Sequence, residues 1–238
     1  MRSVGWGALA IVAVLLGACT TGSGTLDALR ERGAGGGSTR PYDSLDDLLG
    51  NVEYQWSAGQ PQPLTVAVVI GRFESAGPGV AFTVAGADAP GGRSEDFDAP
   101  GATWKTVEAS FVVDQVISGA LDRADRVQVG LAFGPDIDPA TVEDDLRRLG
   151  RTVLFLDRSP VFAYNPQLYG TVADGTLLAT VADDGTLALP ALDADQAASL
   201  LRATPTLTAL TTAASGPRRT VTLDPSGAEV ISETTDAD

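Results

Sequence analysis

The feature that most constrains the fold is a pair of neighbouring segments, residues 104–117 and 126–133, in which apolar and polar residues alternate. A period of two places successive side chains on opposite faces of a β-strand. The phase slips at Val116 and Ile117, which predicts a β-bulge there. With residues 119–125 as the turn, we expect two long paired strands. The side chains expected to face the core are Val107, Ala109, Phe111, Val113, Val127, Val129, Leu131 and Phe133.

Further strands are expected on both sides of this pair. Residues 64–73 are apolar on both faces and predict a central strand, with residues 80–84 returning beside it across the Gly77-Pro78-Gly79 sequence. Residues 151–156 predict a buried strand. Residues 168–189 predict a meander with tight turns at Asp174-Gly175 and at Asp183-Asp184-Gly185, because Asp-Gly between apolar runs favours a hairpin.

Three short helices are expected between these strands, over residues 44–52, 138–149 and 193–202. Asp138 is suited to cap the second helix, with Pro139 in its first turn. Asp193 and Gln196 form the capping pair expected for the third.

These elements predict a mainly β (α+β) domain with two or three short helices. The single cysteine allows no disulfide within the chain, so packing alone must hold the domain together. A closed barrel removes exposed sheet edges without such a bond. The order of strand, turn, strand, helix and the run Val153-Leu154-Phe155-Leu156 resembles small antiparallel OB-like β-barrels of exported actinobacterial proteins. The resemblance implies a barrel and no particular activity.

The N-terminus has the parts of an export signal: Arg2, an apolar run from Val4 to Leu16, and small residues after it. The Leu16-Gly17-Ala18-Cys19 sequence resembles a bacterial lipobox. This resemblance implies cleavage between Ala18 and Cys19, a diacylglyceryl group on the Cys19 sulfur, and attachment to the cell membrane on its extracytoplasmic face. There are two alternatives to lipidation: an ordinary signal peptide, in which Cys19 is an incidental thiol, or an uncleaved membrane anchor.

The expected organisation has four parts. Residues 1–18 are a lipoprotein signal peptide and residues 19–62 a lipid-anchored flexible linker with a short helix. Within the linker, about 25 Gly-, Ser- and Thr-rich residues would span roughly 25–30 Å on average, and residues 26–32 have the pattern of a helical turn. Residues 63–204 form the barrel-like domain, and residues 205–238 a weakly ordered tail.

Charge and composition exclude several kinds of function. The net charge of −15 argues against binding to nucleic acid, whose phosphates require Lys and Arg. The absence of histidine removes the most common general base and metal ligand, so we expect neither a metal nor another cofactor.

Two loops are candidate binding surfaces. The first contains Phe162, Tyr164 and Tyr169, whose rings and hydroxyl groups suit a peptide or a glycan; the alternative is that the rings plug one end of the barrel. The second contains Asp96 and Asp98, with Glu95, around Phe97; the alternative is a solvated loop. Asp136 and Asp138 alternate as calcium ligands do, but Asp138 is better explained as the helix cap.

Three functions follow from these observations. The first is a non-enzymatic binding module, held to the membrane through Cys19, whose partner is an envelope protein or a cell-wall polymer. The second is a carrier of a small molecule or lipid inside the barrel. The third is a carboxylate-based hydrolase, for which no pair of acids stands out.

Overall fold

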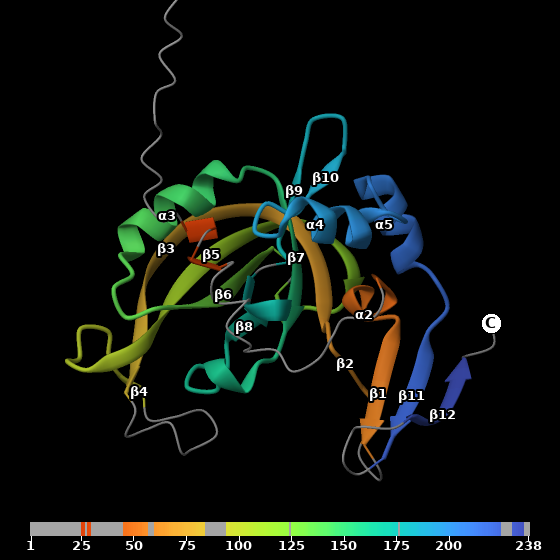
Figure 1. Cartoon of the computed structure of the whole chain (residues 1–238), viewed down its shortest axis with the longest axis horizontal. Coiled ribbons are helices and arrows are strands. Elements are labelled where there is room, and N and C mark those ends of the chain that lie inside the picture. Colours follow the sequence, from red (N-terminus) through yellow and green to blue (C-terminus); the bar gives the residue numbers. More distant parts are fainter. Residues whose placement is uncertain are drawn as a thin grey trace, which may run out of the picture.

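The computed structural model describes residues 25–26, 28–29, 45–56, 60–83, 94–123, 125–175, 177–224 and 230–235. Ala18 and Cys19 lie outside the described residues. The fold is mainly β, as expected (Figure 1). Its strands are β1 (Val52–Trp56), β2 (Gln62–Pro63), β3 (Ala67–Thr83), β4 (Ser94–Asp96), β5 (Ala102–Gly119), β6 (Arg126–Phe133), β7 (Thr152–Asp157), β8 (Leu168–Thr171), β9 (Ala179–Val181), β10 (Leu187–Ala188), β11 (Arg219–Leu223) and β12 (Val230–Thr235). Its α-helices are α2 (Leu45–Leu49), α3 (Pro139–Arg148), α4 (Ala194–Leu201) and α5 (Leu207–Ala214). The short 3₁₀ turns are η2 (Pro160–Phe162) and η3 (Val172–Gly175).

The strands form two sheets. The larger has the order β10-β9-β7-β8-β6-β5-β3-β4, and a further pairing of β7 with β3 partly closes it into a ring of β3, β5, β6, β8 and β7. The smaller sheet has the order β12-β11-β1-β2 and joins residues near both ends of the described chain.

Both sheets are mixed, so the expectation of an antiparallel fold was wrong. β6 pairs with β8 in parallel, and β1 pairs with β11 in parallel. In the ring, the parallel pair has a geometric cause. Strand directions cannot alternate all the way around an odd number of strands, so a ring of five needs at least one parallel pair.

The hairpin predicted across residues 77–79 was also wrong. These residues lie inside β3, a single strand of 17 residues that pairs with β5 along its length. The register shifts between Pro78 and Ala81, where the Thr106 hydroxyl accepts from the Val80 N–H at 2.8 Å and donates to the Val80 carbonyl at 3.2 Å. This side chain therefore bonds the backbone at the irregularity, and Gly79 leaves the room that Thr106 occupies.

Other strand predictions had mixed outcomes. The bulge near Val116 and Ile117 was confirmed, because Val68 pairs with Ser118 and Val69 with Val116, which leaves Ile117 as the extra residue. The turn at residues 183–185 joins β9 and β10 in an antiparallel hairpin, as predicted. The chain does turn at Asp174-Gly175, in η3, but the predicted hairpin was wrong, because β8 and β9 each pair with β7 and not with each other.

The predicted helices are present as α2, α3 and α4, with different bounds. Asp138 caps α3 by accepting from the Ala140 N–H at 3.1 Å, and Asp193 caps α4 by accepting from the Gln196 N–H at 2.8 Å. Helix α5 makes a fourth α-helix in the described chain, and no pattern predicted it. Thr206 caps α5 by accepting from the Ala209 N–H at 3.2 Å.

Two large apolar clusters hold the larger sheet. The first fills the ring with the inward side chains of its strands and of α3, among them Phe111, Leu131, Phe133, Leu146, Leu154 and Leu156. The second lies between the sheet and the helices α2, α4 and α5, and it includes Leu48, Ile70, Phe155 and Leu210. This second cluster therefore contains residues from before and after Thr204. The proposed division of the chain into parts at residues 62 and 204 stays a prediction.

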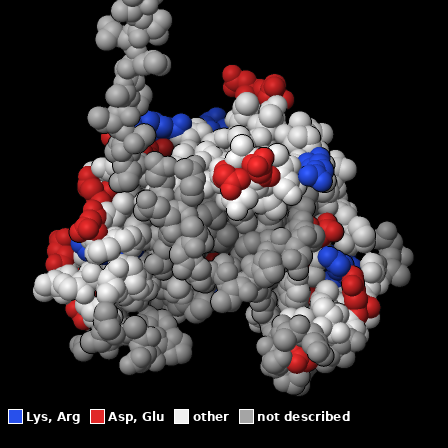
Figure 2. Space-filling view, viewed as in Figure 1, with Lys and Arg blue, Asp and Glu red and all other residues white. Residues whose placement is uncertain are grey.

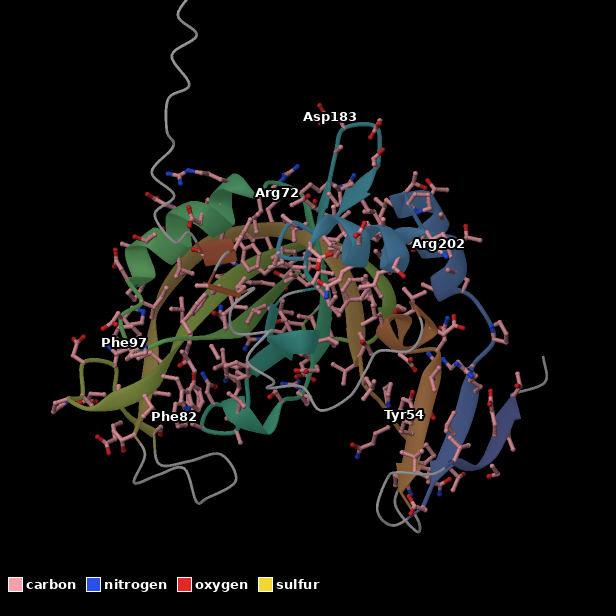
Figure 3. All side chains as sticks on the ribbon, viewed as in Figure 1. Tyr54, Arg72, Phe82, Phe97, Asp183 and Arg202 are labelled. Carbon is pink, nitrogen blue, oxygen red and sulfur yellow. The ribbon has the colours of Figure 1, made fainter. Side chains whose placement is uncertain are left out.

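On the face of the molecule that Figure 2 shows, the acidic side chains of the described residues do not form one patch. They lie in several separate groups, with basic side chains close to some of them. Asp183 lies at the tip of the β9–β10 hairpin, and Arg202 follows α4 (Figure 3). Among the described residues, no helix combines the length and the apolar character that a membrane crossing requires.

Candidate binding site

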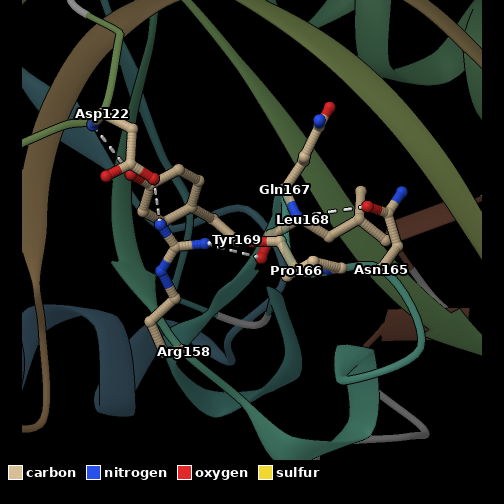
Figure 4. Close-up of polar contacts among 7 residues, drawn as sticks. All are labelled: Asp122, Arg158, Asn165, Pro166, Gln167, Leu168 and Tyr169. Atoms are coloured by element: carbon tan, nitrogen blue, oxygen red, sulfur yellow. Dashed lines mark hydrogen bonds and ion pairs between the residues drawn. The ribbon is translucent and has the colours of Figure 1, made fainter.

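The loop of residues 158–167, between β7 and β8, is held in place by Arg158. Its guanidinium donates to the carbonyls of Pro166 at 3.0 Å and of Leu168 at 3.2 Å, and it forms an ion pair with Asp122 (Figure 4). The same guanidinium stacks over the Tyr169 ring at 3.8 Å. A planar group with several donors is suited to this combination of stacking and forked hydrogen bonding. Arg158 therefore ties this loop to the β5–β6 loop of residues 120–125.

A pocket of about 460 Å³ lies beside the contacts between Arg158 and Asp122, Pro166 and Tyr169. Its walls come from the end of the β5–β6 loop, the start of β6, the end of the β7–β8 loop and the start of β8. The lining residues are Asp122, Arg123, Asp125, Arg126, Val127, Gln128, Pro166, Gln167 and Tyr169. A volume of this size lies within the range of small-molecule and cofactor sites in proteins.

The pocket wall carries charges of both signs, together with neutral amides. Arg126 pairs with Glu74 at 2.9 Å, and half of each side chain is exposed. Arg123 makes no ion pair with another residue of the described chain, so its guanidinium is available to a ligand. Figure 4 shows the Gln167 side chain extended away from the hydrogen bonds around Arg158. The arrangement provides donors and acceptors for a polar ligand.

The Tyr169 side chain is the aromatic group that lines this pocket. It is 4 % exposed and belongs to the cluster that fills the ring of strands. Its hydroxyl accepts from the Asp122 N–H at 3.2 Å, which satisfies the polar end of an otherwise buried side chain. The hydrogen bond from Asp122 therefore links Tyr169, at the start of β8, to the β5–β6 loop.

The other two predicted aromatic residues, Phe162 and Tyr164, lie in the β7–β8 loop and do not line the pocket. Phe162 is buried and packs against Gly130, where any Cβ would overlap its ring. The Tyr164 hydroxyl lies 2.9 Å from the Thr106 hydroxyl and donates to the Glu108 carboxylate at 3.2 Å. The loop thus covers the outer face of β5 and β6. Of the three aromatic residues predicted to form a binding surface, only Tyr169 lines the pocket, and it lies in strand β8 and not in the loop.

The acidic segment of residues 94–98 forms a separate surface. It was expected to be a loop, but residues 94–96 form β4, which pairs with β3. Asp96 and Asp98 are exposed and do not line the pocket. Beside them, the Lys105 ammonium lies 4.4 Å from the centre of the Phe97 ring. The rings of Phe82 and Trp104 stack with centres 3.8 Å apart at the same end of β3 and β5, and Figure 3 shows Phe82 and Phe97 there. The predicted binding surface is therefore divided between two places, and its role in binding stays a prediction.

The pKa shifts mark structural contacts. Burial, followed by the charge of Glu108, raises the pKa of the Tyr164 hydroxyl above its usual range, although the Thr106 hydrogen bond opposes this. Hydrogen bonds from the Thr141 hydroxyl and the Ala140 N–H lower the pKa of Asp138, as expected for a helix cap. No group of three or more His, Cys, Asp or Glu residues in the described chain is arranged to hold a metal ion.

Sequence reasoning missed most of the pocket. It assigned residues 119–125 only to a turn and did not consider Gln128 or Gln167. The available signal was the repeated pair Asp122-Arg123 and Asp125-Arg126, in which opposite charges recur three positions apart. Such charges are equally common in solvated turns, so the pattern did not distinguish a site from a surface loop.

Comparison with known proteins adds no relative: no family model, no curated protein and no solved structure matches the chain.

Proposed function

We propose that the partly closed ring is an OB-like β-barrel. The support is the order of its pairings, β3-β5-β6-β8-β7 and back to β3, with α3 between β6 and β7 in the chain. OB-folds are five-stranded, partly open barrels that bind oligosaccharides or oligonucleotides on the face of the second and third strands and on nearby loops. In chain order the five strands of the ring are β3, β5, β6, β7 and β8. The pocket is lined by the third of these strands, β6, and by the loop between the fourth and the fifth, β7 and β8.

On this basis the protein is a membrane-anchored envelope lipoprotein that acts as a binding module. A lipid on Cys19 holds it at the extracytoplasmic face of the cell membrane. The pocket beside Tyr169 binds a polar segment, peptide or glycan, of another envelope protein or of a cell-wall polymer. The observation that carries this proposal is a pocket of about 460 Å³, lined by arginines, carboxylates and amides, where Arg158 joins the β5–β6 and β7–β8 loops.

The character of the pocket favours such a ligand over the other classes. A chain with a net charge of −15 is repelled by nucleic acid, and the pocket itself combines both signs. A carrier would need space inside the ring, which packed side chains occupy. No observation on the described residues favours the carrier or the carboxylate-based hydrolase.

The experiment is capture of partners from intact envelopes with the tagged full-length protein. Cys19→Ala should move the protein out of the membrane fraction, which tests the anchor by itself. Arg123→Glu should abolish capture of the defined partner. Arg202→Glu makes the same charge change at an exposed residue away from the pocket and should leave capture intact.

Two results would contradict the binding proposal. One is capture that Arg123→Glu does not change, and the other is equal loss with Arg202→Glu. Circular dichroism of each purified variant establishes that the fold is retained, so that loss of capture can be assigned to the pocket.

A further inference from the structure

We infer that a clasp formed by Thr25, Leu26, Ala28 and Leu29 docks on the domain, holds the α3 end of the ring toward the membrane and turns the pocket away from it. The starting observation is Leu29, which is fully buried although it belongs to a segment expected to be a flexible linker. Its side chain is part of the cluster that fills the ring, and it packs beside Gly175, where an added Cβ would lie 3.1 Å from it. This inference rests on the proposed lipid at Cys19.

Several further contacts fix the clasp to the domain. The Thr25 N–H donates to the Asp145 carboxylate of α3 at 2.8 Å, and Thr25 itself is buried. Leu26 and Ala28 are partly buried against the same cluster as Leu29. The residues therefore share one buried face with α3 and with the segment after β8.

The clasp leaves a short connection to the anchor. Six peptide steps separate Cys19 from Thr25, so the chain between them reaches at most about 20 Å. The Gly-rich residues 33–37 follow the clasp. Because the docked clasp precedes these residues in the chain, their length does not add to the distance between the lipid and the domain.

The clasp and the pocket lie at opposite ends of the ring. Asp145 lies on α3, which follows the end of β6, and Gly175 lies on η3, which follows the end of β8. The pocket lies where β6 and β8 begin. Between Val127 at the pocket and Phe133 at the far end of β6, six residues of strand span about 20 Å. A tether that leaves from the α3 end therefore presents the pocket to the space beyond the membrane.

The experiment compares two insertions of the same sequence. Insertion of about twenty Gly and Ser residues between Gly24 and Thr25 lengthens the connection ahead of the clasp by roughly 25 Å on average. The same insertion between Gly35 and Gly36 lengthens the chain behind it. If the clasp holds the domain, the insertion before Thr25 changes the position of the domain at the membrane, and the insertion after Gly35 does not.

Position is measured with the lipidated protein in vesicles of phosphatidylglycerol and phosphatidylethanolamine. A fluorescent label is attached at Asp144→Cys on α3 or at Ala163→Cys in the β7–β8 loop; both positions are exposed. A quencher on the lipid headgroups should reduce the emission at 144 at least threefold more than at 163. The insertion before Thr25 should remove this difference, and the insertion after Gly35 should preserve it.

Equal quenching at the two sites, or equal effects of the two insertions, would overturn the inference. Two further results separate it from the proposed anchor. If Cys19→Ala leaves the protein in the membrane fraction, the anchor proposal fails. In the Cys19→Ala protein, Leu29→Ser should accelerate hydrogen exchange of the Thr25 amide at least tenfold, while Leu192→Ser in the other cluster should not. Fast exchange in the unsubstituted protein would refute the clasp whether or not the protein is lipidated.

Discussion

Replacement of Arg158 by lysine tests whether one side chain organises the pocket. Lysine keeps the charge but loses the planar fork and the stacking surface. In the structure, Arg158 donates to two carbonyls, pairs with Asp122 and stacks on Tyr169 at 3.8 Å. The ion pair contributes little, because the Asp122 side chain is 76 % exposed and water screens it.

The remaining contacts set the magnitude. Loss of one charge-assisted hydrogen bond costs about 1.5 kcal/mol, and loss of the stacking at a partly exposed site costs about 0.5–1 kcal/mol. We expect Arg158→Lys to lower the free energy of unfolding by about 2 kcal/mol, or the melting temperature by about 4–8 °C in a domain of this size. Urea unfolding of the Cys19→Ala protein measures the first quantity, and calorimetry measures the second.

Arg148→Lys is the matched control, since Arg148 also pairs with acids but its side chain is 72 % exposed on α3. We expect that change to cost no more than about 0.5 kcal/mol. The reasoning is refuted if Arg158→Lys costs equally little, because the loop would then be held by other contacts.

Three further predictions concern the packing around the site. Gly130→Ala should lower the free energy of unfolding by about 1–3 kcal/mol in urea titrations, because its Cβ overlaps the Phe162 ring, and Phe162→Ala should relieve part of that cost in the double variant. Tyr164→Phe should unfold with a weaker dependence on pH above 10: the raised pKa of Tyr164 gives stability that is complete below the usual value near 10 and is lost as pH rises toward the folded-state pKa. Equal slopes for the two proteins in urea titrations from pH 9 to pH 11 would contradict this assignment. Leu210→Ala should cost about 2–5 kcal/mol in the same assay, whereas Thr208→Ala at an exposed position of α5 should change stability by less than about 0.5 kcal/mol.

Local patterns predicted the elements whose signals lie within one segment. The alternation of β6 and the phase slip in β5 depend only on which side of a strand each residue occupies, and both were confirmed. The caps Asp138 and Asp193 bond to N–H groups two and three residues later, so their signals are equally local.

The failures depend on partners distant in the sequence. Gly77-Pro78-Gly79 has the composition of a turn, but the Thr106 hydroxyl bonds the neighbouring backbone of Val80 and the strand continues. Leu29 and Leu210 are apolar residues in segments rich in small or polar residues, so neither belongs to a strong periodic pattern. Each is buried because a surface formed by other elements receives it.

The position of the pocket follows from the number of strands in the ring. Five strands cannot all pair in antiparallel fashion, and here the unavoidable parallel pair is β6 with β8. Parallel neighbours begin at the same end of a sheet, so the loops that precede them must meet there. Those loops are residues 120–125 and 158–167, the two that Arg158 joins and that supply most of the charged and amide groups of the pocket wall. Alternation along a strand carries no information about the direction of its neighbours, so the sequence predicted the strands but not the place where these two loops meet.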